Sequence, residues 1–203
     1  MHIKNVIFDF GGVIIDANAR YLLSKFFNSE AKLEVFLESV QIHENWHVPA
    51  DLGQPIEDVN VAFIEKFPEY EEQIRAYDKR WAEILGNPIS GSVDIFRALE
   101  ARGNLGLYGL TNWPTGKFSE ARKKITFIDS FNDIVVSSVE KVAKPDPEIY
   151  RILLDRNNLD PATCLFIDDR LENITTALDL GFQGHHFKDP EKLRQDLMRR
   201  ALL

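Results

Sequence analysis

The stretch that decides the fold is VIFDFGGVII, which occupies residues 6–15. It opens with Val6–Phe8, an apolar run too short for a buried helix, and an aspartate and a pair of glycines follow. A short apolar run that ends near glycines is typical of a buried strand that meets a turn. We therefore expect the fold to begin with a buried strand that ends at Asp9.

Similar apolar runs recur in the second half of the chain and are separated by helical patterns. The runs lie at residues 105–110, 134–136, 164–167 and 185–187. Helical patterns begin near Ser92, Thr115, Asp146, Leu171 and Pro190. Short strands that alternate with helices indicate βαβ units and a parallel sheet buried on both faces. The sequence thus predicts an α/β fold with a doubly wound, Rossmann-like parallel sheet.

The segment between the first strand and this alternating region has a different pattern. Apolar residues recur there at helical spacing in four successive stripes, and Ser29 or Asn28 suits the cap of the second helix. No strand pattern interrupts the stretch. We expect residues 17–88 to form an all-helical domain, called the helical insertion below, and residues 1–16 and 89–203 to form the α/β core.

Composition excludes several classes of protein. The length of 203 residues suits one full domain, or one domain with a smaller insertion, and a hydrophobic fraction of 44% is typical of a globular chain rather than a disordered one. Its single cysteine rules out an intramolecular disulfide. The net charge of -8 disfavours nonspecific binding to nucleic acid or to an anionic membrane. With no run of about 20 apolar residues and no targeting pattern, we expect a cytoplasmic location.

Polar residues follow three of the apolar runs at the point where each ends. Asp9 follows the first run, Thr111 and Asn112 follow the second, and Asp168 and Asp169 end the fourth. In open parallel sheets, ligands bind beyond the carboxyl ends of the strands. We therefore expect these side chains to converge on one site.

The carboxylates of this group suit a nucleophile and a metal ion. Asp9 is ionised at neutral pH and can act as an oxygen nucleophile, a metal ligand or a simple turn residue. The adjacent charges of Asp168 and Asp169 need a compensating cation or donors, and Mg²⁺ prefers such oxygens, although one of the two could cap the next helix. Asn173, four residues beyond Asp169, could face the same cleft or lie exposed.

The remaining polar residues suit a phosphate group. Thr111 and Asn112 stand at a strand-to-helix junction, where backbone N–H groups bind anions, although an ordinary helix cap is the plain alternative. Lys144 lies in the sequence KPDP, whose prolines restrict the backbone. A cation held there could balance phosphate charge, or it could be a solvated surface lysine.

The order of these elements is more specific than any one of them. In this order the sequence resembles the haloacid dehalogenase (HAD) superfamily, and the resemblance covers essentially the whole chain. Its four motifs are similar to IFDFGGVIID at 7–16, LTN at 110–112, KPD at 144–146 and FIDD at 166–169 with Asn173. The helical insertion falls where subclass I members of the superfamily place a helical cap.

The resemblance implies a hydrolase that acts through a covalent aspartyl-phosphate. Asp9 would be the nucleophile, and Lys144 would be the second catalytic residue. Mg²⁺ would be held by Asp9, the carbonyl of Gly11 and Asp169. The substrate would be a small phosphate ester, with sugar phosphates as one class.

The resemblance also assigns the other polar residues. Thr111, Asn112 and Lys144 would bind the phosphoryl oxygens. Asp168 and Asn173 would support the metal ligands or replace one of them. In the helical insertion, His43, Trp46 and His47 could line the substrate entrance, or they could pack between helices.

One position departs from the family pattern and keeps two alternatives open. Most phosphatases of the superfamily carry an aspartate two residues after the nucleophile as general acid and base, but here Gly11 has no side chain to transfer a proton. The first alternative is a metal-independent 2-haloacid dehalogenase that uses Asp9, with Arg20 as the arginine that binds the substrate carboxylate. The second is a noncatalytic phosphate-binding protein.

Overall fold

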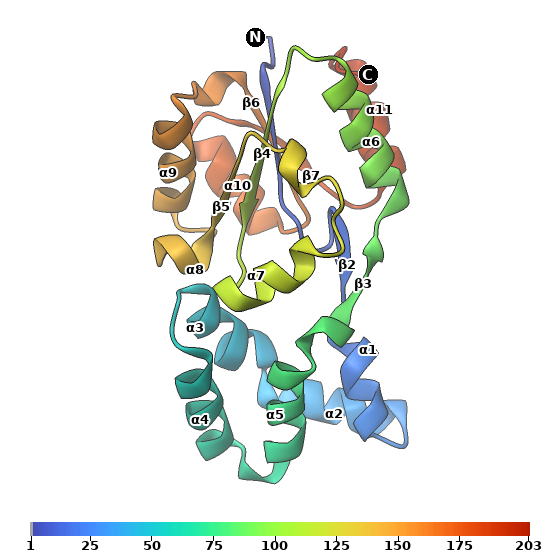
Figure 1. The fold of residues 1–203 in the computed structure, drawn as a ribbon, viewed down its shortest axis with the longest axis vertical. Coiled ribbons are helices and arrows are strands. Elements are labelled where there is room, and N and C mark those ends of the chain that lie inside the picture. The colour runs from blue at the N-terminus through green and yellow to red at the C-terminus, as the bar shows by residue number, and fades with distance from the viewer. Residues whose placement is uncertain (1) are drawn as a thin grey trace.

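The computed structural model describes residues 2–203 and is built around a five-stranded parallel sheet (Figure 1). The strand order is β5-β4-β1-β6-β7, and every neighbouring pair is parallel. The strands are β1 (Asn5–Phe8), β4 (Gly106–Thr111), β5 (Asp133–Val136), β6 (Cys164–Asp168) and β7 (Gln183–His186). The predicted α/β fold with a doubly wound parallel sheet is confirmed.

The central strand is buried on both faces, which explains its continuous apolar sequence. Val6 and Phe8 of β1 pack into one hydrophobic cluster, and Ile7 packs into another. On the neighbouring strand β6, Leu165 belongs to the first cluster and Phe166 to the second. Because successive side chains of a strand point to opposite faces of the sheet, the core is divided into two layers, one on each face.

Helices cover both faces of the sheet. The first layer receives apolar side chains from α6 (Ser90–Ala101), α7 (Thr115–Arg122) and α11 (Pro190–Arg199), and the second from α9 (Pro147–Asn157) and α10 (Leu171–Asp179). The short helix α8 (Ser137–Glu140) follows β5. None of the helices within residues 2–203 is long and apolar enough to cross a membrane.

The helical insertion lies at the end of the sheet where the strands terminate (Figure 1). It contains α1 (Arg20–Leu23), α2 (Glu30–Val40), α3 (Val48–Asp51), α4 (Ile56–Lys66) and α5 (Glu71–Lys79), with a π-helical turn at His43–His47. The hydroxyl of Ser29 accepts a hydrogen bond from the backbone N–H of Lys32, so Ser29 caps α2, one of the two residues expected there. Single 3₁₀ turns lie at Ser24–Phe26, Pro68–Tyr70, Trp81–Ile84, Ile128–Ser130 and Pro161–Thr163.

The prediction that residues 17–88 are entirely helical is wrong at both ends of the segment. The strand β2 (Ile15–Ala17) pairs with β3 (Leu85–Pro88) in a second, antiparallel sheet of two strands. Each strand has only three or four residues, and β3 contains glycine, asparagine and proline, which are depleted in strands. The pairing depends on a partner distant in sequence, so the local pattern does not reveal it.

The helical insertion and the core share one continuous hydrophobic cluster. At the contact, the ring of Trp81 meets the ring of Trp113 edge to face, with centroids 5.6 Å apart, and the ring of Phe10 lies 6.5 Å from that of Trp113. An ion pair reinforces the contact, because Lys117 Nζ of α7 lies 2.7 Å from Asp78 Oδ1 of α5. The helical insertion is therefore packed directly over the carboxyl end of the sheet.

The aromatic centre of the first layer gives a test of the fold. Phe96 is fully buried, with ring centroids 4.6 Å from Phe131 and 4.7 Å from Phe127. Phe96→Ala is expected to lower the free energy of unfolding by about 3–5 kcal/mol, because it leaves a cavity among packed rings. The exposed Met198→Ala should change it by about 0.5 kcal/mol or less. Urea denaturation of both variants would contradict this packing if their losses were equal.

Candidate active site

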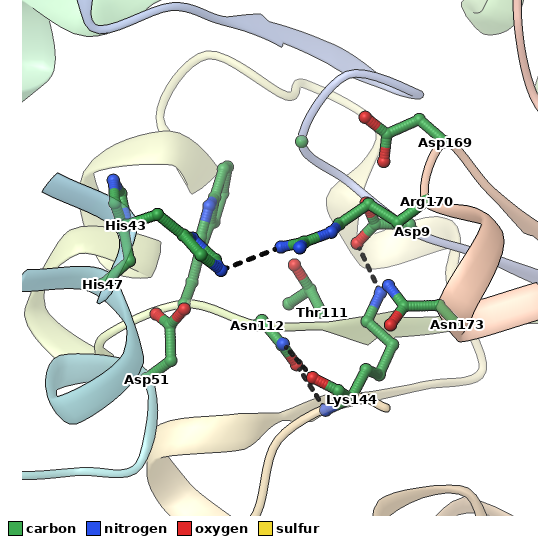
Figure 2. A pocket seen from close by; sticks show the side chains of 12 residues that line it. Asp9, His43, His47, Asp51, Thr111, Asn112, Lys144, Asp169, Arg170 and Asn173 are labelled. Atoms are coloured by element: carbon green, nitrogen blue, oxygen red, sulfur yellow. Dashed lines mark hydrogen bonds and ion pairs between the residues drawn. The ribbon is translucent and has the colours of Figure 1, made fainter. Parts of the chain in front are cut away.

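A cavity of about 190 Å³ lies between the carboxyl ends of the strands and the helical insertion (Figure 2). Every residue that the family resemblance assigns to catalysis, phosphate binding or metal binding lines this cavity except Asp168, which is fully buried. The helical insertion contributes His43, His47 and Asp51. Residues from four separate motifs are thus brought together at one end of the sheet.

The ammonium of Lys144 is the charge centre of the site. Its Nζ lies 2.8 Å from Asp9 Oδ1, 2.7 Å from Asp168 Oδ2 and 2.8 Å from the carbonyl oxygen of Leu110. A lysine has three donors, so these partners occupy all of them. Burial alone would lower the pKa of Lys144, but the two carboxylates outweigh that effect and raise it. The lysine is therefore charged and offsets part of the negative charge of the carboxylates.

Asp168 is fully buried, and its side chain is held by hydrogen bonds to other residues of the site. Besides Lys144, it accepts hydrogen bonds from Asn173 Nδ2 at 2.9 Å and from the backbone N–H of Arg170 at 2.8 Å. Asn173 in turn lies at the start of α10, where Tyr150 donates to its carbonyl at 2.9 Å. These contacts fix Asp168 as a partner of Lys144 rather than as a group open to the cavity.

Asn112 holds the loop that carries Lys144. Its side-chain amide donates to the carbonyl of Lys144 at 2.8 Å and accepts from the backbone N–H of Lys144 at 2.9 Å. The amide is therefore engaged with the main chain instead of being aimed at a phosphate. The neighbouring Thr111, which is buried at the end of β4, also lines the cavity.

The donor set fits a divalent cation. Oxygen atoms of Asp9, Asp168 and Asp169 lie within 4.8 Å of one another. Burial, followed by the repulsion of Asp168, raises the pKa of Asp169, and burial also raises that of Asp9 despite the opposing charge of Lys144. Three carboxylates against one ammonium leave an excess of negative charge that a Mg²⁺ ion would balance. Asp169, the exposed member, faces the cavity together with Asp9.

The two glycines after Asp9 differ in what the backbone requires. Gly12 has φ of 73°, and a Cβ there would lie 2.8 Å from Asp169 Oδ2. Gly11 lies outside the left-handed region, and the nearest atom to a Cβ there would be Trp113 Nε1 at 3.8 Å. The turn therefore needs glycine at position 12, whereas position 11 has room for a side chain.

Two of the three residues considered in the helical insertion reach the cavity. Arg170 Nη1 donates to His43 Nε2 at 3.1 Å and so spans the cavity between core and insertion (Figure 2). His47 Nε2 is hydrogen-bonded to the hydroxyl of Tyr77 at 2.8 Å, and burial lowers the pKa of His47 to about 4, so its ring is neutral. Trp46 is fully buried, donates to Asn60 and packs inside the insertion.

Asp51 and Arg170 line the cavity although neither was predicted from the sequence, whereas Arg20, like Trp46, lies away from it. Arg170 directly follows the acidic pair, and that position was a usable signal. Asp51 ends the short helix α3, and nothing in its sequence context marks it. Arg20, proposed for the dehalogenase alternative, instead pairs with Glu30 at 2.6 Å and Glu34 at 2.5 Å away from the cavity.

Comparison with known proteins agrees with this geometry. A family model described as haloacid dehalogenase-like hydrolase matches residues 3–181. The chain belongs to this hydrolase family. A solved HAD family enzyme from Bacteroides thetaiotaomicron, a mutant in complex with magnesium and inorganic phosphate, has a TM-score of 0.70 at 22% identity, over 92% of this chain and 95% of that one.

The relatives of this HAD-like hydrolase include proteins named as phosphatases. A sesquiterpene phosphatase from Aspergillus oryzae is 32% identical over 102 residues, which are 50% of this chain and 52% of the relative. The chain spans about half the length of the first curated relatives that it matches. A D-ribitol-5-phosphate phosphatase from B. thetaiotaomicron is 23% identical over 207 residues, or 96% of this chain and 97% of the relative.

The glycine pair gives a matched test of the site geometry. Gly12→Ala is expected to lower stability by about 1 kcal/mol or more, because it forces a positive φ on alanine and crowds Asp169. Gly11→Ala should be tolerated, since its methyl group makes only an ordinary contact with Trp113. The melting temperatures of the two variants provide the measurement. A melting temperature that is lower for Gly11→Ala than for Gly12→Ala would contradict this description of the turn.

Proposed function

We propose that this HAD-like hydrolase is a Mg²⁺-dependent phosphatase of small phosphate esters that acts through an aspartyl-phosphate on Asp9. The observation that carries the proposal is the position of Asp9. Its carboxylate faces the cavity, accepts a hydrogen bond from the buried Lys144, and stands beside the exposed carboxylate of Asp169. The phosphatase names of the relatives and the magnesium-phosphate complex of the solved neighbour support the same chemistry.

In this proposal Asp9 attacks phosphorus in line and displaces the alcohol of the ester. Lys144 fixes the orientation of the carboxylate through Oδ1. The hydroxyl of Thr111, at the carboxyl end of β4, binds a phosphoryl oxygen from the cavity wall. Mg²⁺, held by Asp9, the carbonyl of Gly11 and Asp169, would supply positive charge to the phosphoryl group.

The remaining predicted residues hold this arrangement in place. Asn112 fixes the main chain of Lys144, and Asn173 fixes Asp168, which pairs with the ammonium. We assign Asp168, Asn112 and Asn173 to positioning, because both side-chain oxygens of Asp168 and both polar side-chain atoms of Asn112 have partners within the site, and the amide nitrogen of Asn173 donates to Asp168.

The cavity favours a small substrate. Its volume of about 190 Å³ is below the usual range of roughly 300–1,000 Å³ for drug-sized ligands. Arg170 and His43 border it with polar groups that suit hydroxylated leaving groups. A phosphorylated sugar or polyol fits these properties, as does the name of the D-ribitol-5-phosphate phosphatase relative.

Metal dependence gives the first test of the proposal. Turnover of p-nitrophenyl phosphate is expected to require Mg²⁺ and to vanish with a chelator, because Asp9 and Asp169 repel the anionic substrate without a cation. Asp169→Asn should lower the affinity for Mg²⁺, whereas Asp179→Asn, at the exposed end of α10, should leave it unchanged. Full turnover after chelation and dialysis would refute the metal assignment.

The nucleophile gives a second test. Asp9→Asn is expected to lower kcat by about 10³-fold or more, because an amide oxygen cannot form the covalent intermediate. The fold should persist, since Asp168 still neutralises Lys144. Beryllium fluoride, a mimic of the phosphoryl group, should bind to the wild-type protein and not to the variant. An active variant with a normal melting temperature would reduce Asp9 to a turn residue.

A further inference from the structure

We propose that Asp51 of the helical insertion is the general acid and base of the reaction. This inference rests on the phosphatase function proposed above. The leaving oxygen of an alkyl phosphate needs a proton as its bond to phosphorus breaks. Gly11, which stands two residues after the nucleophile, has no side chain to provide one. The proton must therefore come from another group that reaches the cavity.

Asp51 lies where such a group is needed. It ends α3 and lines the same cavity as Asp9. Figure 2 shows the two carboxylates on opposite walls, with Thr111 and Asn112 between them. In an in-line displacement the leaving oxygen departs on the side away from the nucleophile. A phosphoryl group bound at Thr111 would thus direct its leaving oxygen toward Asp51.

The hydrogen bonding of Asp51 also indicates a missing ligand. The side chain is 5% exposed, and Oδ1 is buried without a hydrogen-bond partner. Among residues 2–203 it is the one carboxylate with such an oxygen. Buried polar atoms are nearly always paired in native structures, so an unpaired one in a cavity needs an explanation. A substrate oxygen that shares a proton with Asp51 provides that partner.

The surroundings of Asp51 set its protonation. Burial raises its pKa to about 7, Lys144 opposes this rise, and Asp9 adds to it. The other charged or titratable groups that line this cavity are Arg170, His43, His47 and Asp169, while Tyr77 bonds to His47 behind it and Asp146 lines an adjoining pocket with Asp51. His47 is a poor alternative acid, because its low pKa leaves it neutral and its Nε2 is bonded to Tyr77. Asp51 can therefore hold a proton near neutral pH and release it.

The proposed steps balance in protons and bonds. In the first step an oxygen of Asp9 bonds to phosphorus, the ester P–O bond breaks, and the proton of Asp51 moves to the departing oxygen. In the second step a water molecule attacks the phosphoryl group, and its proton moves to the carboxylate of Asp51. The bond between phosphorus and Asp9 breaks with release of phosphate, and both aspartates return to their initial states.

The decisive experiment compares two leaving groups. For Asp51→Asn, kcat/KM with an alkyl phosphate such as glycerol phosphate should fall by about 10²–10⁴-fold, because this constant reports the steps through departure of the alcohol. With p-nitrophenyl phosphate it should be nearly unchanged, because the nitrophenolate leaves without a proton. The value of kcat should fall for both substrates, since both need the same attack by water.

Two variants control this comparison. Asp58→Asn removes an exposed carboxylate of α4 in the same insertion and should leave both substrates unaffected. Gly11→Asp introduced into Asp51→Asn should restore part of the alkyl phosphate activity, because position 11 has room for a side chain beside the nucleophile. The pH dependence of the wild-type protein gives a further test. Its kcat/KM should fall above about pH 7 for the alkyl phosphate, as Asp51 loses its proton, and not for p-nitrophenyl phosphate.

Each outcome separates this inference from the proposed function. Equal losses of kcat/KM on both substrates in Asp51→Asn, no loss on either, or pH profiles that coincide for the two wild-type reactions would overturn the role of Asp51. In those cases a wild-type protein that is active and inactivated by Asp9→Asn would leave the phosphatase function intact. A wild-type protein that hydrolyses neither ester in Mg²⁺ would overturn both proposals.

Discussion

The buried ammonium of Lys144 is the interaction on which the rest of the site depends. An isolated charge in a protein interior costs several kcal/mol, so it must be matched by partners of fixed geometry. Here the partners are Asp9 after β1, Asp168 at the end of β6 and the carbonyl of Leu110 in β4. These strands are neighbours in the order β4-β1-β6. One side chain therefore joins the ends of the three central strands and orients the carboxylate that faces the cavity.

The sequence predicted the site residues that lie at the ends of strands. It did not predict contacts that depend on the packing of segments far apart in the chain. Asp9, Thr111 and Asp169 were found because parallel strands place their carboxyl ends at one edge of the sheet. The pairing of β2 with β3 was missed, because neither strand has enough residues to show a period. Asp51 was missed as well, since only the placement of α3 over the sheet brings it to the cavity.

The core and the helical insertion contribute different physical properties to the cavity. The core provides the charges, through Lys144 and the carboxylates of Asp9 and Asp169. The insertion provides apolar coverage, because its aromatic cluster continues into the core through Trp81 and Trp113. Coverage of this kind excludes water and lowers the local dielectric constant, which strengthens each charge interaction beneath it. The raised pKa of Asp51 is one result of this coverage.

The small sheet formed by β2 and β3 has a mechanical consequence. The chain enters and leaves the helical insertion through these two strands, and their pairing ties both crossings together. Gly86 of β3 packs so close to Asp16 of β2 that a Cβ would lie 2.8 Å from its carboxylate oxygen. Both covalent connections between the core and the insertion thus run through this one ribbon, and α3 lies on the opposite side of the insertion (Figure 1). Any rotation of the helical insertion about this ribbon would therefore move α3 more than the residues beside the ribbon.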